Sequence, residues 1–226
     1  MRRCWSLVLA GSMAAVFACT KEEAVRTPVI VQTNPNFPND ARLSESILRV
    51  SSRLIAAVRQ LPDSQLHARE LRWVMTLHDH QAPPRSFVWP DGRIEVSSGA
   101  MALAETEAGL AAILGHEFGH ALAHVPAPNL SQDVDATKQE LPLFTLEEEL
   151  EADKIGLNLM ADAGYDPREL LWLWERMKQR NGDVADGLAV HLIYDRRMEH
   201  IAQSLPDALV RYQRSNRAPQ KTLPLR

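Results

Sequence analysis

Two histidines that lie four residues apart, with a glutamate beside the first, constrain the fold of this chain most. They belong to the run His116-Glu117-Phe118-Gly119-His120. The surrounding stretch, residues 104–123, is rich in Ala and Leu, which favour the α-helix. Positions four apart share one face of a helix, so the two imidazoles can bind a single zinc ion. The sequence therefore predicts a helix over residues 104–123 with a metal site in its middle; two ordinary histidines on a helix face are the alternative.

Glu117 is one step around the predicted helix from the two histidines. It can take a proton from a water molecule bound to the metal, whose charge lowers the pKa of that water to about 7. The hydroxide that results can attack a carbonyl carbon. Gly115 and Gly119 flank the motif, although each glycine costs a helix about 1 kcal/mol relative to alanine. We therefore expect something to approach the helix backbone closely at these two positions.

A third zinc ligand is needed, and the sequence offers two candidates. His124 continues the same helical face, but it lies about 6 Å further along the axis than His120, so we expect it to support the site without binding the ion. The acidic run from Glu147 to Asp153 is the other candidate. Glu149 and Asp153 share a helix face, so Glu149 can complete the ligand set while Asp153 accepts a hydrogen bond from a ligand imidazole. Solvated acids at a helix start are the alternative interpretation.

The N-terminal residues predict export. Residues 1–19 combine two arginines with an apolar run that is shorter than the roughly 20 residues of a membrane-spanning helix. The run ends in Val16-Phe17-Ala18-Cys19, which resembles the lipobox of bacterial lipoproteins and implies a lipid anchor on Cys19. A plain secretory signal cleaved near Ala18 is the alternative. The only other cysteine, Cys4, lies within the signal, so no internal disulfide is expected.

The remaining sequence predicts one metal-binding domain over residues 41–205. Residues 20–40 contain three prolines and predict a flexible tether, and the basic stretch 206–226 is predicted to be disordered. Apolar spacing and turn residues within the domain predict helices and short strands, and Ile94 to Ser97 is expected to be a sheet edge that can pair with an extended substrate. The expected fold is α+β, mostly helical with a small mixed β-sheet. Helices are predicted at 43–58, 145–163, 167–178 and 194–204, and extended segments at 71–77, 87–89 and 93–97.

Four stretches together resemble one family, the zinc metalloendopeptidases that include the CAAX prenyl endopeptidase, HtpX, BepA and LoiP. The resemblance covers roughly residues 71–205 and is nearest to the periplasmic lipoprotein branch. It implies a zincin-like fold. The matching stretches are Trp89-Pro90-Asp91-Gly92-Arg93-Ile94-Glu95-Val96-Ser97-Ser98-Gly99, Leu114 to His120, Glu149-Leu150-Glu151-Ala152-Asp153 and Ala163-Gly164-Tyr165-Asp166-Pro167.

The resemblance also implies roles for individual residues. Glu149 would be the third zinc ligand beside His116 and His120, with one Zn²⁺ per chain, and Asp153 would orient His116. Glu117 would be the catalytic base. His191 and Arg197 fall at the spacing of the family residues that steady the oxyanion.

The predicted function is that of a zinc-dependent metalloendopeptidase of the bacterial cell envelope that hydrolyses peptide bonds of unfolded or misassembled envelope proteins. The predicted location is the periplasmic side of the outer membrane, through the lipid on Cys19. Protein or peptide substrates and envelope-assembly proteins are the expected partners. The formal net charge of −4 gives no reason to expect nucleic acid. A zinc-binding chaperone or assembly factor with little proteolysis is the alternative function.

Overall fold

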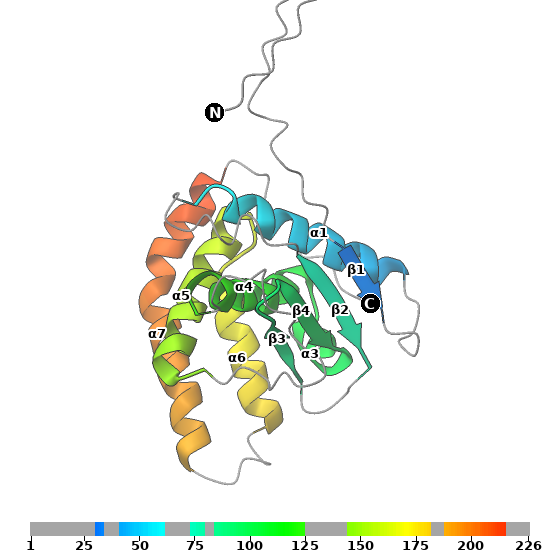
Figure 1. Ribbon diagram of the computed structural model, residues 1–226. Helices are drawn as coiled ribbons and strands as arrows, with labels where there is room; N and C mark the ends of the chain where they lie inside the picture. The colour runs from blue at the N-terminus through cyan, green and yellow to red at the C-terminus, as the bar shows by residue number, and fades with distance from the viewer. Residues whose placement is uncertain are drawn as a thin grey trace, which may run out of the picture.

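The fold is mostly helical and contains one small mixed sheet, as the sequence predicts (Figure 1). The computed structural model describes residues 30–33, 41–61, 73–79, 84–124, 144–181 and 188–215. The strands are β1 (Ile30–Thr33), β2 (Val74–His78), β3 (Ser86–Val88) and β4 (Arg93–Ser97). The helices are α1 (Ala41–Val58), α3 (Ser98–Ala104), α4 (Glu107–Ala123), α5 (Leu146–Asp162), α6 (Arg168–Asn181) and α7 (Leu188–Arg214).

The four strands lie in the order β1-β2-β4-β3. β2 is parallel to both of its neighbours, whereas β3 and β4 form an antiparallel hairpin around a turn at Gly92, whose φ is 86°. The predicted pair of extended segments around a turn is therefore confirmed. The prediction that residues 94–97 form a sheet edge is wrong, because β4 is paired on both sides. The edge strand of the hairpin is β3, which lies beside α4 (Figure 1).

The helix that carries the histidine motif begins later than predicted. α4 begins at Glu107, and the Oγ1 of Thr106 caps it by accepting a hydrogen bond from the backbone N–H of Gly109 at 3.0 Å. Glu105, with a φ of 61°, separates α4 from the preceding α3. A Cβ at Gly109 would lie 2.0 Å from the carbonyl oxygen of Ala104, so only glycine allows the two helices to meet this closely.

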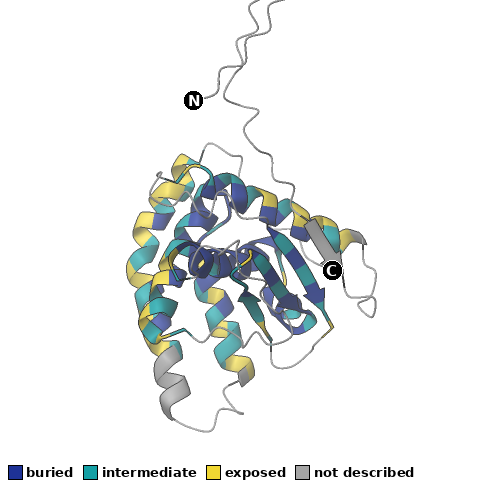
Figure 2. Cartoon of the chain, viewed as in Figure 1, coloured by how far each residue is buried: buried dark blue, intermediate teal, exposed yellow. Residues whose placement is uncertain are grey.

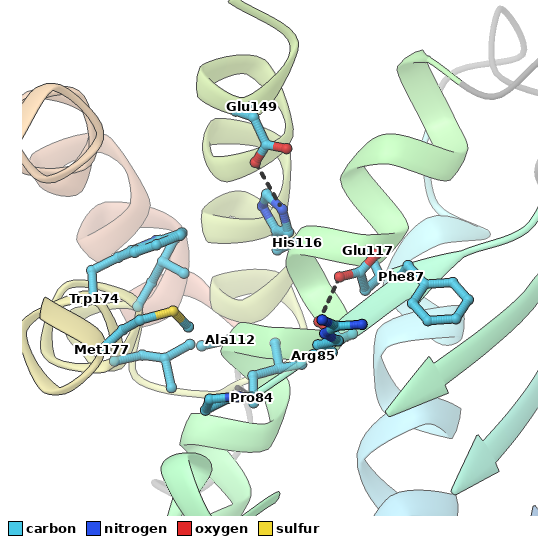
Figure 3. Close-up of a pocket in the computed structure, with 13 residues that line it drawn as sticks. Pro84, Arg85, Phe87, Ala112, His116, Glu117, Glu149, Trp174 and Met177 are labelled. Carbon is cyan, nitrogen blue, oxygen red and sulfur yellow. Dashed lines mark hydrogen bonds and ion pairs between the residues drawn. The ribbon is translucent and has the colours of Figure 1, made fainter. Parts of the chain in front are cut away.

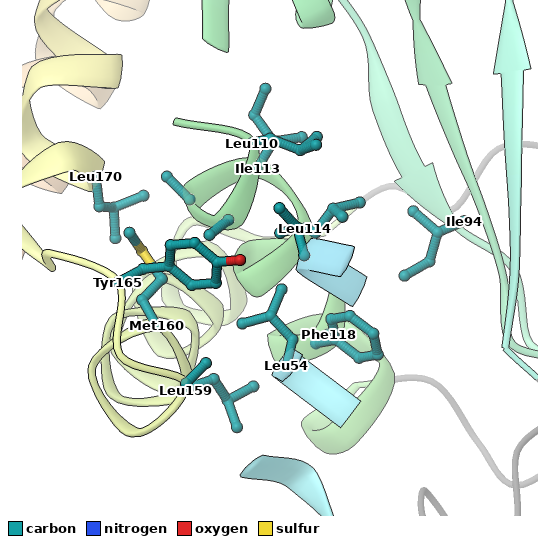
Figure 4. Close-up of a cluster of buried hydrophobic side chains, with 14 of the residues drawn as sticks. Leu54, Ile94, Leu110, Ile113, Leu114, Phe118, Leu159, Met160, Tyr165 and Leu170 are labelled. Carbon is teal, nitrogen blue, oxygen red and sulfur yellow. The ribbon is translucent and has the colours of Figure 1, made fainter. Parts of the chain in front are cut away.

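α4 runs through the centre of the molecule, between the sheet and the helices α5 and α6 (Figure 1). Nearly all of its residues are buried, as expected of a helix that is apolar on every side (Figure 2). Figure 4 shows apolar side chains of α4 packed against α1, the sheet and the helices that follow. The rings of Trp73 and Phe118 pack with centroids 4.3 Å apart. This packing fixes the backbone of the motif helix.

Ordered structure extends beyond both predicted ends of the domain. β1 lies within the predicted tether and pairs with β2, in a register that sets Ile30 opposite Val74. α7 continues through Pro206 to Arg214, although the sequence suggested that the domain ends at residue 205. The reason is that the apolar face of α7 continues past the proline, and Ile201 and Ala208 are both buried. Among the described residues, no helix is both long and apolar enough to cross a membrane.

Candidate metal centre

Close contact between α4 and α5 builds the site. A Cβ on Gly119 would lie 2.5 Å from the backbone oxygen of Ala152, and a Cβ on Gly156 would lie 2.7 Å from the backbone of Gly115. The two helices can pack this closely only because these positions lack side chains. The expected close approach to the glycines of the motif is thus confirmed, and the approaching element is α5. The crossing brings Glu149 to the two histidines, and Figure 3 shows it opposite His116.

His116, His120 and Glu149 bring three potential ligand atoms to one point. The Nε2 atoms of the two histidines are 3.1 Å apart. The carboxylate of Glu149 lies 3.3 Å from Nε2 of His116 and 3.5 Å from Nε2 of His120. All three ligand atoms lie within 4.8 Å of one another. Two imidazole nitrogens and one carboxylate oxygen are a donor set of catalytic zinc sites, which leave a fourth position for water or substrate. The residues therefore fit Zn²⁺.

Asp153 and Arg197 support the ligands from behind. The Nδ1 atom of His116 is 2.9 Å from Oδ1 of Asp153, as expected for the residue that orients this imidazole. Arg197 donates to both oxygens of Asp153 at 2.7 Å and also pairs with Glu149. Its guanidinium stacks 3.8 Å from the ring of Trp174, and the residue is only 5% exposed. The donors of Arg197 thus contact Asp153 and the ligand Glu149, and its predicted oxyanion role stays a prediction.

The charges of this cluster depend on one another. Burial lowers the pKa of His116, but hydrogen bonds to Asp153 and Glu149 outweigh it and raise that pKa to about 9 in the metal-free protein. Burial raises the pKa of Glu149, yet its hydrogen bonds to the two histidines and the charge of Arg197 hold it well below its usual range. For Asp153 the charge of Arg197 likewise outweighs burial and lowers the pKa. Both carboxylates are therefore ionised and ready to support a cation.

Glu117 follows His116 on the motif helix and lies toward β3. Its Oε1 atom accepts a hydrogen bond of 2.6 Å from the hydroxyl of Ser86 (Figure 3). Burial raises the pKa of Glu117, and the charge of His116 and the bond from Ser86 oppose that effect. A carboxylate with a raised pKa beside a zinc site is suited to accept a proton near neutral pH.

His120 is held by groups on the side away from its ligand nitrogen. Its Nδ1 atom lies 3.1 Å from Nδ1 of His124, whose Nε2 atom lies 3.2 Å from Glu151. Phe144 stacks on the His120 ring with centroids 3.7 Å apart. Burial lowers the pKa of His120, so the neutral form that binds zinc is favoured. His124 contacts a ligand without joining the cluster, which agrees with the supporting role expected for it.

Two predicted residues fall outside what the structure describes. His191 belongs to the backbone of α7, but its side chain is not among the described groups, and its role stays a prediction. Cys19 and the predicted signal also lie outside the described residues. Conversely, no sequence pattern pointed to Ser86 or Phe144. Both reach the site only through tertiary contacts, because Ser86 is 31 residues from Glu117 in the chain.

The fold is α+β, and two histidines of one buried helix meet a glutamate of a second helix, as in zincin-like metallopeptidases. Residues 46–139 match the family model of Peptidase family M48. Three relatives, each named mitochondrial metalloendopeptidase OMA1, agree with that match. The protein from Saccharomyces cerevisiae is 31% identical over 175 residues, and that from Schizosaccharomyces pombe is 32% identical over 173 residues. The protein from Arabidopsis thaliana is 33% identical over 151 residues. Over the matched residues the chain is therefore similar to Peptidase family M48 and to these endopeptidases.

The matches cover only part of each relative. They span 65% of this chain and 51% of the proteins from both yeasts, and 56% of this chain and 31% of the plant protein. The chain thus spans about half the length, or less, of the curated relatives it matches. They also correct the predicted location, a lipid-anchored protein of the bacterial outer membrane, because all three relatives are mitochondrial proteins. The matches do not single out the periplasmic lipoprotein branch that the resemblance favoured.

Proposed function

We propose that this chain is a zinc-dependent metalloendopeptidase that hydrolyses peptide bonds in protein or peptide substrates. One Zn²⁺ is held by His116, His120 and Glu149. The observation that carries the proposal is the convergence of these three groups from two helices, with a buried glutamate next to them. The names of the matched relatives support an endopeptidase.

The chemistry divides between the metal and the chain. When bound, zinc polarises the substrate carbonyl and lowers the pKa of a water molecule. Glu117 accepts the proton of the attacking water and returns it to the amine nitrogen as the C–N bond breaks, so water is added across the peptide bond. Ser86 holds the carboxylate of Glu117 in place through its 2.6 Å hydrogen bond. Asp153 and Arg197 keep His116 and Glu149 in position.

The edge strand β3 supports extended backbone as the substrate form. Within the described residues, β3 pairs with β4 alone, and Ser86 at its start touches Glu117. A substrate strand that adds to this edge therefore passes next to the base. Such pairing recognises the backbone groups of an extended segment, and unfolded or misassembled chains expose many such segments. We infer that unfolded protein segments are the substrate class.

Cleavage of internally quenched peptides with blocked termini tests the proposal, because only an endopeptidase cuts them. The zinc-loaded protein is compared with Glu117→Gln, which keeps the shape of the side chain but cannot accept the proton. We expect the variant to retain zinc and to lose about 10²-fold to 10⁴-fold in kcat/KM. Cleavage by Glu117→Gln at the rate of the unchanged protein would contradict the mechanism.

A further inference from the structure

Arg85, which directly precedes β3, carries a charge that has no partner in the part of the chain that the structure describes. Its backbone is fixed, because its N–H donates to the Oγ of Ser97 and its carbonyl oxygen accepts from the N–H of Ser97, both at 2.9 Å. The residue is exposed, and no ion pair or hydrogen bond joins its guanidinium to another described residue. A cation that is held in place but not neutralised is suited to bind an acidic group.

Arg85 and Phe87 lie between two cavities. Both line the cavity that also contains His116 and Glu117 of the metal centre (Figure 3). Both also line a second cavity of about 170 Å³, and none of the residues around this second cavity is a metal ligand. A substrate that lies next to the metal therefore also adjoins Arg85.

The second cavity lies on the face of the sheet that is turned away from the core. Side chains alternate along a strand, and Val88 and Ile94 of the hairpin are buried in the core. Phe87 and Glu95, which are paired in register, therefore face outward, and both line the cavity. Arg85 comes two residues before Phe87 and is on the same outward side.

The acid of this cavity is already bonded. One oxygen of Glu95 accepts a hydrogen bond of 2.8 Å from the indole N–H of Trp89, and the other lies 2.8 Å from Nε2 of His78. Glu95 therefore has little capacity left for a basic ligand. Among the described residues around the cavity, the positive charge of Arg85 is the one without a counter-charge.

We propose that Arg85 determines substrate specificity by pairing with an acidic side chain next to the substrate residue that lies at the metal. The inference rests on the proposed function and adds a charge preference to it. A strand that adds to the edge of β3 also alternates its side chains between the two faces of the sheet. The substrate residue level with Ser86 points toward Glu117. Its neighbour therefore lies on the outer face beside Arg85, where the cavity has room for the carbon stem of a glutamate.

The first experiment measures the charge preference without cleavage. Short peptides of Thr, Ser and Val with blocked ends carry Glu, Gln or Lys at each position in turn, and fluorescence anisotropy follows their binding to the zinc-loaded Glu117→Gln protein. At one position, the Glu peptide should bind about 2-fold to 5-fold more tightly than the Gln peptide, and the Lys peptide less tightly, as for charge pairs across neighbouring strands. The difference should shrink in about 1 M NaCl, which screens exposed charges. Equal binding of the three peptides at every position, or no binding at all, would overturn the proposal.

The second experiment reverses the charge, with all variants compared at equal zinc content. In Arg85→Glu the same peptide position should favour Lys over Gln, whereas Arg85→Lys should keep the preference for Glu. Arg93→Glu is the matched control, because Arg93 lies on the same face of the hairpin but pairs with Asp91 and does not line the cavity. A preference for Glu that persists in Arg85→Glu, or that reverses equally in Arg93→Glu, would overturn the assignment.

Mass-spectrometric mapping of cleavage sites separates this inference from the proposed function. An acidic residue enriched at one fixed position near the scissile bond supports the inference. Cleavage by the unchanged protein without such enrichment overturns it and leaves the endopeptidase function intact. A charge preference in binding that follows Arg85, without cleavage of any peptide, would instead reject the endopeptidase function and keep Arg85 as a peptide-binding residue.

Discussion

At the scale of single residues, the bond between Ser86 and Glu117 sets how the base titrates. Ser86 stabilises the ionised carboxylate and so lowers the pKa of Glu117, against the effect of burial. Because the base must be ionised to act, Ser86→Ala should move the acidic limb of the kcat/KM profile to higher pH. A pH–rate profile of both proteins at equal zinc content measures the shift. An unmoved limb would show that another group controls it.

His116 makes zinc binding depend on pH. Its pKa of about 9 in the metal-free protein means that the imidazole is protonated at pH 7, and the proton must leave when zinc binds. We therefore expect the Kd for zinc to tighten by about tenfold per pH unit from pH 6.5 towards 9. Competition titrations with a chelator, run at several pH values, test this expectation.

The raised pKa of His116 also affects the stability of the metal-free fold. This stability falls as the pH rises, whereas the affinity for zinc increases. A raised pKa stabilises the folded protein fully below the unfolded value of 6.5, and this stability is lost as the pH rises through about 9. Asp153→Asn, which removes a partner that raises the pKa of His116, is the control and should flatten both dependences. A Kd that does not vary with pH in the unchanged protein would contradict the protonated state of His116.

At the scale of elements, the crossing of α4 and α5 should tolerate a substitution at Gly115 better than one at Gly119. A Cβ on Gly115 meets its nearest atom, the carbonyl oxygen of Gly156, at 3.1 Å, whereas one on Gly119 meets backbone of Ala152 at 2.5 Å. Gly119→Ala should therefore cost about 1–3 kcal/mol through overpacking and loosen zinc binding. Gly115→Ala should be milder, and helix propensity favours both changes equally. Denaturant unfolding and zinc titration of the two variants provide the comparison.

Local patterns predicted the elements that depend on local chemistry. One example is the spacing that brings His116 and His120 together. Another is the helix cap at Thr145, which forms the expected capping box with Glu148. The break at Glu105 was missed because Ala-rich sequence favours helix on both sides of it. The edge position of β3 was missed because strand order is a tertiary property, which alternation along one strand does not encode. The contacts made by Ser86 and Phe144 are also tertiary, and for that reason they were not predicted. The third ligand, in contrast, was suggested by the sequence.

At the scale of the whole molecule, Arg197 ties α7 to the metal centre. It is buried and paired with Asp153 and Glu149 of α5, so Arg197→Ala removes one partner from each of these two ion pairs. Loss of one partner from a buried ion pair costs about 3–5 kcal/mol, and we expect a loss of that order in the free energy of unfolding. Chemical denaturation measures it. Arg211→Ala is the control, since its pair with Asp162 joins the same two helices at an exposed position.

Because Arg197 lies late in the chain, the groups of the metal centre are made in a defined order during synthesis. The ribosome makes His116 first and Arg197 81 residues later. Until α7 emerges and docks, Asp153 and Glu149 lack the guanidinium of Arg197, and the support for the first histidine is incomplete. A nascent chain that already displays the whole histidine motif is thus still unable to hold its ligands in place. The support of the metal ligands is therefore complete only after α7 has been made and has docked.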